Sequence, residues 1–118
     1  MTATECTALN AEHVRWPELA PVPAERVLTG SPATSTVFLA DSRGYQLGLW
    51  KVTPGTFTTD HTGYIEFIHI VEGLGRLVSE TGSVTELQPG TTTLMPPGWK
   101  GRWEVDTTLT KVFTIIQH

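Results

Sequence analysis

The chain has 118 residues, of which 39% are hydrophobic and 17% charged, and this composition suits one globular domain with a single core. Its formal net charge is −4 and its basic residues are scattered singly, so no basic stripe exists to neutralise a row of phosphates and no nucleic-acid partner is expected. No apolar run approaches the roughly 20 residues that span a bilayer, and no basic and apolar leader opens the chain, so we expect a soluble, cytoplasmic protein without membrane contact.

The first 24 residues (1–24) are expected to form an N-terminal arm, and residues 25–118 the folded domain. Three prolines between positions 17 and 23 forbid a long helix in the arm. The arm also carries Trp16, whose indole would waste apolar area if it were left in water. We therefore expect Trp16 to dock on the domain or on a second subunit.

From residue 25 onward the chain consists of short runs rich in Val, Ile, Thr and aromatic residues, separated by Gly, Pro, Asp or Ser. Most of the eleven glycines and eight prolines fall between the runs, where turns require positive φ or an end to strand pairing. No run keeps a helical apolar period over three turns, so the pattern predicts an all-β fold, either a sandwich or a closed double-sheet barrel. The nine expected strands are residues 26–30, 35–40, 45–53, 57–71, 75–80, 83–87, 91–96, 101–105 and 109–116.

The stretch from residue 54 to residue 73 organises the chain, because it combines turn glycines, candidate polar site residues and the most apolar strand. It contains the first of two glycine-bounded motifs, and the second begins after a gap of sixteen residues. One such motif is a weak signal, because Gly and Pro occur in the turns of every β protein, but two motifs in order are a stronger one. The motif residues are Gly55, His61, Glu66 and Gly73 in the first motif, and Gly90, Pro96 and Gly98 in the second.

These two motifs resemble those of the cupin superfamily, in which glycines, a glutamate and a Pro-x-Gly stand at this spacing. The strings IVEG at 70–73, PPGWKGRWEV at 96–105 and TKVF at 110–113 are similar to small single-domain cupins of the ureidoglycine-aminohydrolase-like (DUF861) type. The resemblance covers residues 25–116. It implies an all-β, double-stranded β-helix cupin barrel, an RmlC-like jelly roll, with the site in its mouth.

The metal ligands that the resemblance implies are mostly replaced in this chain. Metal-binding cupins carry two histidines and a glutamate on one strand face, but those histidine positions are Asp60 and Thr62 here, and a later ligand position is Gly101. His61 is one residue out of step and would point outward by strand parity, unless a bulge re-aims it. The candidate ligands are therefore Glu66 with His61 or Asp60. Two ligands hold a metal poorly, which leaves either a weakly bound divalent metal or a barrel that has lost its metal.

The strand face of Glu66 leads to the other site predictions. Tyr64 lies on the same face, and this phenol and carboxylate are the candidate catalytic groups. A carboxylate in an apolar mouth pays a desolvation penalty unless a cation or several donors meet it. The expected pocket wall is largely aromatic and comprises Trp50, Ile68, Trp99 and Trp103.

Two functions are compatible with these features. The first is a lyase, hydrolase or isomerase in which Glu66, assisted by Tyr64 or His61, moves protons on a small polar metabolite, and the resemblance points to ureide or amine catabolism. The second is a non-catalytic cupin that has lost its metal site and serves in small-molecule binding or as a structural partner. A homodimer is expected for either role, because exposed edge strands gain by pairing and the arm could cross to a second subunit.

Overall fold

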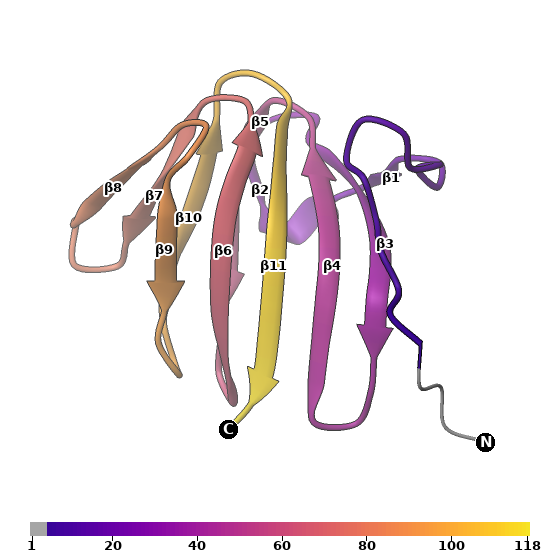
Figure 1. Ribbon diagram of the computed structural model, residues 1–118. Coiled ribbons are helices and arrows are strands. Elements are labelled where there is room, and N and C mark those ends of the chain that lie inside the picture. Colours follow the sequence, from indigo (N-terminus) through magenta and orange to yellow (C-terminus); the bar gives the residue numbers. More distant parts are fainter. Residues whose placement is uncertain (1–4) are drawn as a thin grey trace.

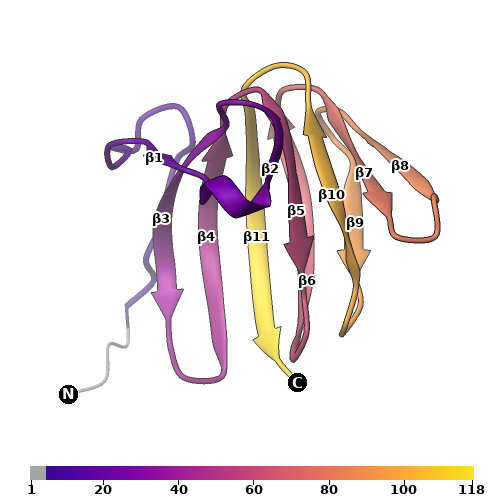
Figure 2. The same cartoon turned by 180° about the vertical axis from the view of Figure 1, so that it is seen from behind.

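The computed structural model describes residues 5–118, in which eleven strands form two sheets that pack face to face (Figures 1 and 2). Sheet A has the strand order β1-β3-β4-β11-β6-β9 and sheet B the order β2-β5-β10-β7-β8, with all pairings antiparallel. The predicted all-β double-sheet architecture is confirmed. The strands are β1 (Ala20–Pro21), β2 (Val27–Gly30), β3 (Ala33–Asp41), β4 (Tyr45–Val52), β5 (Gly55–Asp60), β6 (Tyr64–Glu72), β7 (Gly75–Ser79), β8 (Val84–Leu87), β9 (Thr92–Met95), β10 (Lys100–Val105) and β11 (Leu109–Gln117), and one 3-10 turn, η1, spans Ala24–Arg26.

The core lies between the two sheets and follows the alternation expected of strands that bury one face. Val52, Ile68, Ile70 and Leu109 are completely buried, and Phe57 is 2% exposed. Each such side chain stabilises the fold by roughly 1.5–3 kcal/mol relative to an exposed one. Within residues 5–118 no helix is long and apolar enough to cross a membrane.

The predicted single strand over residues 57–71 is wrong, because the chain turns in the middle of it. Strand β5 ends at Asp60 in sheet B, and β6 begins at Tyr64 in sheet A. Gly63 permits the turn between them with a φ of +88°, which side chains with a Cβ rarely adopt. Strand parity therefore does not extend from β6 back to residues 60–62. The outward position that parity gives His61 is wrong, and the exception allowed for a re-aimed backbone applies, with a turn in place of a bulge: the His61 side chain is 2% exposed.

The predicted arm packs on its own domain. Ala20–Pro21 pairs with β3, Val22 is buried, and the hydroxyl of Ser35 donates a 2.7 Å hydrogen bond to the carbonyl of Pro17. The Lys51 ammonium lies 4.4 Å from the centre of the Trp16 ring, a cation–π contact. Residues 1–4 of the predicted arm lie outside the described residues.

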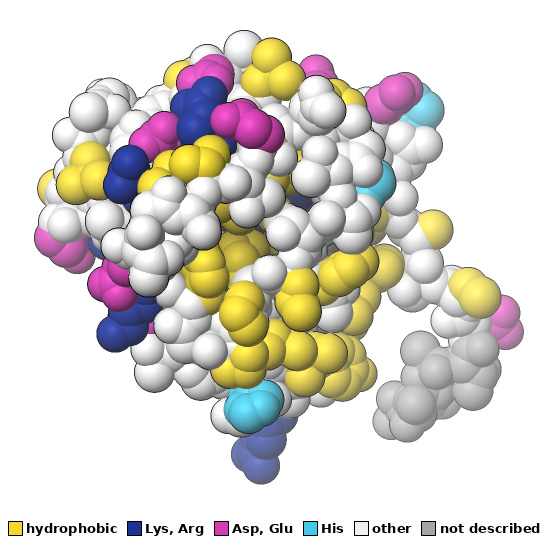
Figure 3. All heavy atoms as spheres, turned by 90° about the vertical axis from the view of Figure 1, so that its left-hand side faces the viewer, with side chains coloured by type: hydrophobic (Ala, Val, Ile, Leu, Met, Phe, Trp, Pro, Cys, Tyr) yellow, Lys and Arg dark blue, Asp and Glu magenta, His cyan; other side chains and the backbone are white. Residues whose placement is uncertain are grey.

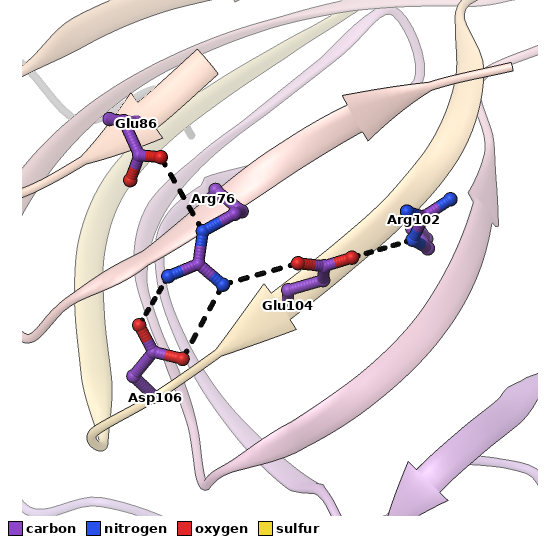
Figure 4. Close-up of polar contacts among 5 residues, drawn as sticks. All are labelled: Arg76, Glu86, Arg102, Glu104 and Asp106. Atoms are coloured by element: carbon purple, nitrogen blue, oxygen red, sulfur yellow. Dashed lines mark hydrogen bonds and ion pairs between the residues drawn. The ribbon is translucent and has the colours of Figure 1, made fainter. Parts of the chain in front are cut away.

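The outer face of sheet B is charged. Arg76 on β7 contacts three carboxylates, those of Glu86 at 3.5 Å, Glu104 at 3.1 Å and Asp106 at 2.5 Å (Figure 4). The hydrogen bonds that Arg76 donates to Asp106 and Glu104 raise the pKa of Arg76 above its usual range. Arg102 holds the other oxygen of Glu104 at 2.7 Å. These side chains are between 25% and 71% exposed, so solvent screens their charges and we assign them little net stability. Their main effect is a hydrated, polar surface.

Substitution of Gly73 tests how tightly the loop after β6 packs. Its φ is +94°, and an added Cβ would lie 2.3 Å from the Thr108 carbonyl oxygen and 2.5 Å from the Leu109 Cα. Gly82 is a matched control, with a φ of +91° and nothing within 4 Å of an added Cβ. We expect Gly82→Ala to lower the free energy of unfolding by about 1–2 kcal/mol through backbone strain alone. Gly73→Ala should cost about 1–3 kcal/mol more because a backbone must move.

Urea denaturation of both variants measures this difference. Equal losses in the two variants would show that the loop after β6 moves aside at no cost, contrary to the packing described.

Candidate functional site

A cavity of about 250 Å³ opens between the two sheets, and both sheets contribute to its wall. Aromatic rings form most of its apolar surface, and polar and charged side chains line the rest, a combination typical of small-molecule sites. The lining residues are Phe38, Trp50, Phe57, Trp103, Phe113 and Ile115 on the apolar side, and Arg26, Thr36, Gln46, Thr59, His61, Tyr64, Glu66 and Lys111 on the polar side.

A buried ion pair joins Glu66 and Lys111 inside this cavity. Lys111 Nζ donates to Glu66 Oε2 over 2.6 Å, and both side chains are only 6% exposed. The two residues lie on the neighbouring strands β6 and β11, where Lys111 is opposite Ile70 and Glu66 is opposite Ile115. The long side chain of Lys111 therefore extends along β11 toward Ile115, which brings its ammonium to the carboxylate. The carboxylate thus has the cation that its desolvation requires.

Aromatic rings surround the same ammonium. Lys111 Nζ lies 4.1 Å from the ring centre of Trp50, 4.7 Å from that of Trp103 and 6.0 Å from that of Phe113. Burial lowers the pKa of Lys111, whereas the charge and hydrogen bond of Glu66 act in the opposite direction. The carboxylate and the ring faces both favour positive charge on this nitrogen, so they offset part of its desolvation.

His61 lies beside the pair, in the turn between β5 and β6. Its Nε2 atom is 3.1 Å from Thr59 Oγ1 and 3.7 Å from Glu66 Oε1, the second distance being too long for a hydrogen bond. Backbone hydrogen bonds of the His61 amide to the Trp99 carbonyl and of the Gly98 amide to the His61 carbonyl fix the turn. Burial lowers the pKa of His61, and the negative charge of Glu66 raises it by less, so the pKa stays below its usual value. A neutral imidazole at neutral pH follows.

Tyr64 stacks on His61, with the ring centres 4.7 Å apart. Burial raises the pKa of Tyr64, and the negative charge of Glu66 raises it further. The phenol therefore stays protonated at neutral pH. It lines the cavity, and its hydroxyl donates a long hydrogen bond of 3.4 Å to the Asp60 carbonyl, which a bound molecule could replace.

The residues around Glu66 do not fit a metal ion. Asp60 is exposed and accepts hydrogen bonds from the Thr62 amide (2.9 Å) and hydroxyl (2.6 Å), which lower the pKa of Asp60 and hold its carboxylate outside the cavity. The predicted metal set of His61, Glu66 and Asp60 therefore does not converge. Within residues 5–118 no three His, Cys, Asp or Glu side chains are grouped to hold a metal. The Lys111 ammonium already occupies the cation position on Glu66 and would repel a second cation.

In the second motif, the space that a ligand side chain at position 101 would need is occupied by an aromatic ring. Gly101 lies on the inward face of β10, and an added Cβ would lie 2.6 Å from an indole carbon of Trp99 and 2.3 Å from the Val78 carbonyl oxygen. A histidine at this position would collide with that indole and backbone. The indole itself packs edge-on against His61, with ring centres 5.7 Å apart.

The structure brings most of the predicted site residues together. Glu66, Tyr64, Trp50 and Trp103 line the cavity. Of the other two predicted pocket residues, Ile68 is completely buried in the core and Trp99 packs behind His61 rather than on the cavity wall.

Two charged wall residues, Lys111 and Arg26, were not predicted. The sequence held a signal for the first: Leu109, Lys111 and Phe113 alternate along one apolar strand, so Lys111 shares the inward face. We find no comparable signal for Arg26, because its position at the cavity depends on how η1 packs against β5.

Comparison with known proteins supports the architecture. The model of the EutQ-like cupin domain matches residues 39–113, almost two thirds of the chain. A protein of unknown function of the DUF861 family from Pseudomonas syringae pv. tomato superposes with a TM-score of 0.77 at 19% identity, over 87% of this chain and 45% of that one. This chain thus spans less than half of that relative's length.

Two further solved structures are similar over most of both chains. The EutQ protein of Clostridium difficile has a TM-score of 0.65 at 19% identity, over 82% of this chain and 79% of that one. Ectoine synthase from P. lautus has a TM-score of 0.63 at 18% identity, over 78% and 68%. At these identities the similarity establishes the fold, and the predicted cupin jelly roll is confirmed. No curated protein matches the sequence.

A double-mutant cycle tests the Glu66–Lys111 pair. Lys111→Met or Glu66→Gln alone leaves a buried charge without its partner, and each should lower the free energy of unfolding by about 3–5 kcal/mol. The double variant should lose less than the sum, with a coupling energy of roughly 1–3 kcal/mol by urea denaturation. Asp60 and Lys100 form an exposed pair at 4.0 Å, and Asp60→Asn with Lys100→Met is the control, for which we expect no measurable coupling.

Strict additivity of the Glu66 and Lys111 substitutions would contradict the pair.

Proposed function

We propose that this chain, which belongs to the EutQ-like cupin domain family, binds a small anionic metabolite in its barrel, where Glu66 and Lys111 transfer protons to and from it. The observation that carries the proposal is the buried pair itself: a carboxylate and an ammonium 2.6 Å apart that line a cavity. A pair needed only for stability gains nothing from an adjoining cavity, and buried pairs are often no more stabilising than apolar residues of the same volume. Perturbed ionisable groups in a cavity are a common mark of functional sites.

The cavity favours a small ligand with negative charge. Its volume of about 250 Å³ corresponds to roughly eight water molecules. Arg26 is half-buried on its wall, and Nε of Arg26 donates a 2.9 Å hydrogen bond to the Thr58 carbonyl, which fixes the guanidinium plane. A planar guanidinium of fixed orientation suits a carboxylate, which it can hold through two parallel hydrogen bonds.

The remaining polar groups suit proton transfer. Glu66 is the candidate base, and the Lys111 ammonium at 2.6 Å is the candidate acid that also stabilises developing negative charge. Neutral His61 and the protonated Tyr64 phenol are available to orient the ligand, as the directions of their pKa shifts indicate. A ligand that fills the space between the aromatic walls would displace water, which would strengthen these electrostatic interactions. A lyase or isomerase reaction on a small carboxylic acid is compatible with this set.

Ligand titrations test the anionic-ligand proposal. Acetate, propionate, lactate and pyruvate should quench the tryptophan fluorescence, because Trp50 and Trp103 line the cavity, whereas the matching amides should bind at least about tenfold more weakly. Arg26→Gln should remove most of the preference for acids over amides. Arg102→Gln is the control, since Arg102 lies on the outer face of sheet B, and it should leave binding unchanged.

No change in fluorescence and no heat of binding with any acid or amide would overturn the proposal. Binding without turnover in the presence of intact Glu66 would support the alternative of a non-catalytic binding module.

We also propose that the chain forms a homodimer through the outer face of sheet A. This face carries a row of large apolar side chains whose register places them together: Phe67 is opposite Leu94 on β9 and Thr114 on β11, and Ile116 is opposite Ile65. Phe67, Leu94, Val112 and Ile116 are 42–55% exposed. Figure 3 views the molecule from the side of β8 and β9, and it shows hydrophobic side chains gathered in the lower half of the view, with charged side chains above them, to their left and at the lower edge.

An apolar face of this kind is complemented by another apolar face, and the charged outer face of sheet B cannot supply it without burying Arg76 and its carboxylates. The same face of a second copy supplies it, in the self-complementary arrangement of a two-fold dimer.

Light scattering tests the dimer. The wild-type protein should have twice the chain mass of 12.9 kDa, and Leu94→Lys should shift it to a monomer by placing a charge in the apolar face. Val84 on β8 is 56% exposed, against 55% for Leu94, but lies on sheet B, so Val84→Lys is the control and should remain dimeric. A wild-type monomer, or equal dissociation of both variants, would contradict the proposed surface.

A further inference from the structure

We propose that Lys111 forms an imine with the carbonyl group of a small 2-oxo acid that enters the cavity, an inference that rests on the proposed function of this site. Three features of the geometry support it: a primary amine on the cavity wall, a carboxylate 2.6 Å from that amine, and a guanidinium on the same wall. The first two can carry out the chemistry at the carbonyl, and the third can hold the carboxylate of the acid.

The surroundings of Lys111 Nζ match the charge of a protonated imine. The amine must lose one proton to attack a carbonyl carbon, and the protonated imine that results again bears a positive charge on the same nitrogen. The faces of Trp50 and Trp103, at 4.1 Å and 4.7 Å, and the Glu66 carboxylate stabilise a cation at this point in either form. Between these two charged forms the amine must be neutral, and the desolvation that burial imposes favours this neutral form.

Proton transfer within the pair balances the reaction. Glu66 takes one proton from the Lys111 ammonium, and the neutral amine attacks the carbonyl carbon to form a C–N bond as the π bond of the C=O group breaks. A second proton then passes from this nitrogen to the carbonyl oxygen, which becomes a hydroxyl group. Glu66 then returns its proton to that hydroxyl, which leaves as water as the C=N bond forms. The sum is amine plus carbonyl compound giving imine plus one water, with no oxidant, reductant or other co-reactant. The 2.6 Å separation of Lys111 Nζ and Glu66 Oε2 makes the first of these transfers a direct one.

The cavity selects the class of carbonyl compound. A volume of about 250 Å³ accommodates an acid of a few carbon atoms. Of the two cations on the described wall, Lys111 is already paired with Glu66, so Arg26 is the one that can complement a carboxylate. A short 2-oxo acid places a carboxylate next to its carbonyl, and an aldehyde without a carboxylate lacks the contact with Arg26. Simple aldehydes should therefore react less readily than 2-oxo acids of similar size.

Reductive trapping tests the inference. Wild-type protein is incubated with pyruvate or glyoxylate and sodium cyanoborohydride, which reduces an imine to a stable secondary amine, and the modified residue is located by peptide mass spectrometry. The chain has three lysines, and the exposed Lys100 and half-buried Lys51 are internal controls in the same sample. We expect Lys111 to be labelled at least about tenfold faster than either. Glu66→Gln should slow labelling of Lys111 and leave that of Lys51 and Lys100 unchanged.

The outcomes separate this inference from the proposed function. Labelling confined to Lys51, Lys100 or the terminal amine would overturn the imine, and the proposed function would survive if pyruvate and propionate still quenched the tryptophan fluorescence. Propionate has the carboxylate without the carbonyl, so it should protect Lys111 from labelling by pyruvate. If neither quenching nor labelling of Lys111 occurs with any of these acids, both the imine and the anionic-ligand site are contradicted.

Discussion

The interior of this barrel depends on the need of one buried carboxylate for a positive partner. Glu66 points between the sheets, where its side chain is only 6% exposed, and Lys111 reaches it from the neighbouring strand at 2.6 Å. Satisfying that charge fixes the register of β6 against β11, because a one-residue slip would turn either side chain to the outer face. It also determines the wall around it, since Trp50 and Trp103 pack their faces against the ammonium. Fold and site therefore share one electrostatic constraint.

The same pair explains why the chain keeps the cupin architecture without the ligand set expected of a metal-binding cupin. In such a barrel a metal cation would neutralise the glutamate, whereas here the Lys111 ammonium does so. The indole of Trp99 fills the space at Gly101, and Asp60 is held outside by Thr62. A cation supplied by the chain can exchange a proton with its carboxylate, and a metal ion cannot. The chemistry that we propose for this cavity is accordingly acid–base and amine chemistry.

Much of the fold could be predicted from the sequence, and less of the site. Alternating apolar residues and regularly placed glycines predicted the strands and the double sheet, because these patterns record local backbone requirements and one buried face. The turn at His61–Gly63 was missed because the residues on both sides favour strands, so His61 received the wrong orientation. Lys111 was overlooked although its parity placed it inward, since a lysine in a strand is usually solvated. Arg26 depends on a crossing of distant segments that no local pattern records.

Heteronuclear NMR of the lysine side chains tests the central pair most directly. A charged Lys111 ammonium bonded to Glu66 and shielded from water should give one slowly exchanging Nζ–H₃⁺ signal at neutral pH, present in the wild type, absent in Lys111→Met and shifted in Glu66→Gln. The signals of Lys51 and Lys100 should exchange rapidly with water. Rapid exchange of all three lysine ammonium groups, together with one divalent metal ion per chain that is lost in Glu66→Gln, would show that a metal and not Lys111 neutralises the carboxylate.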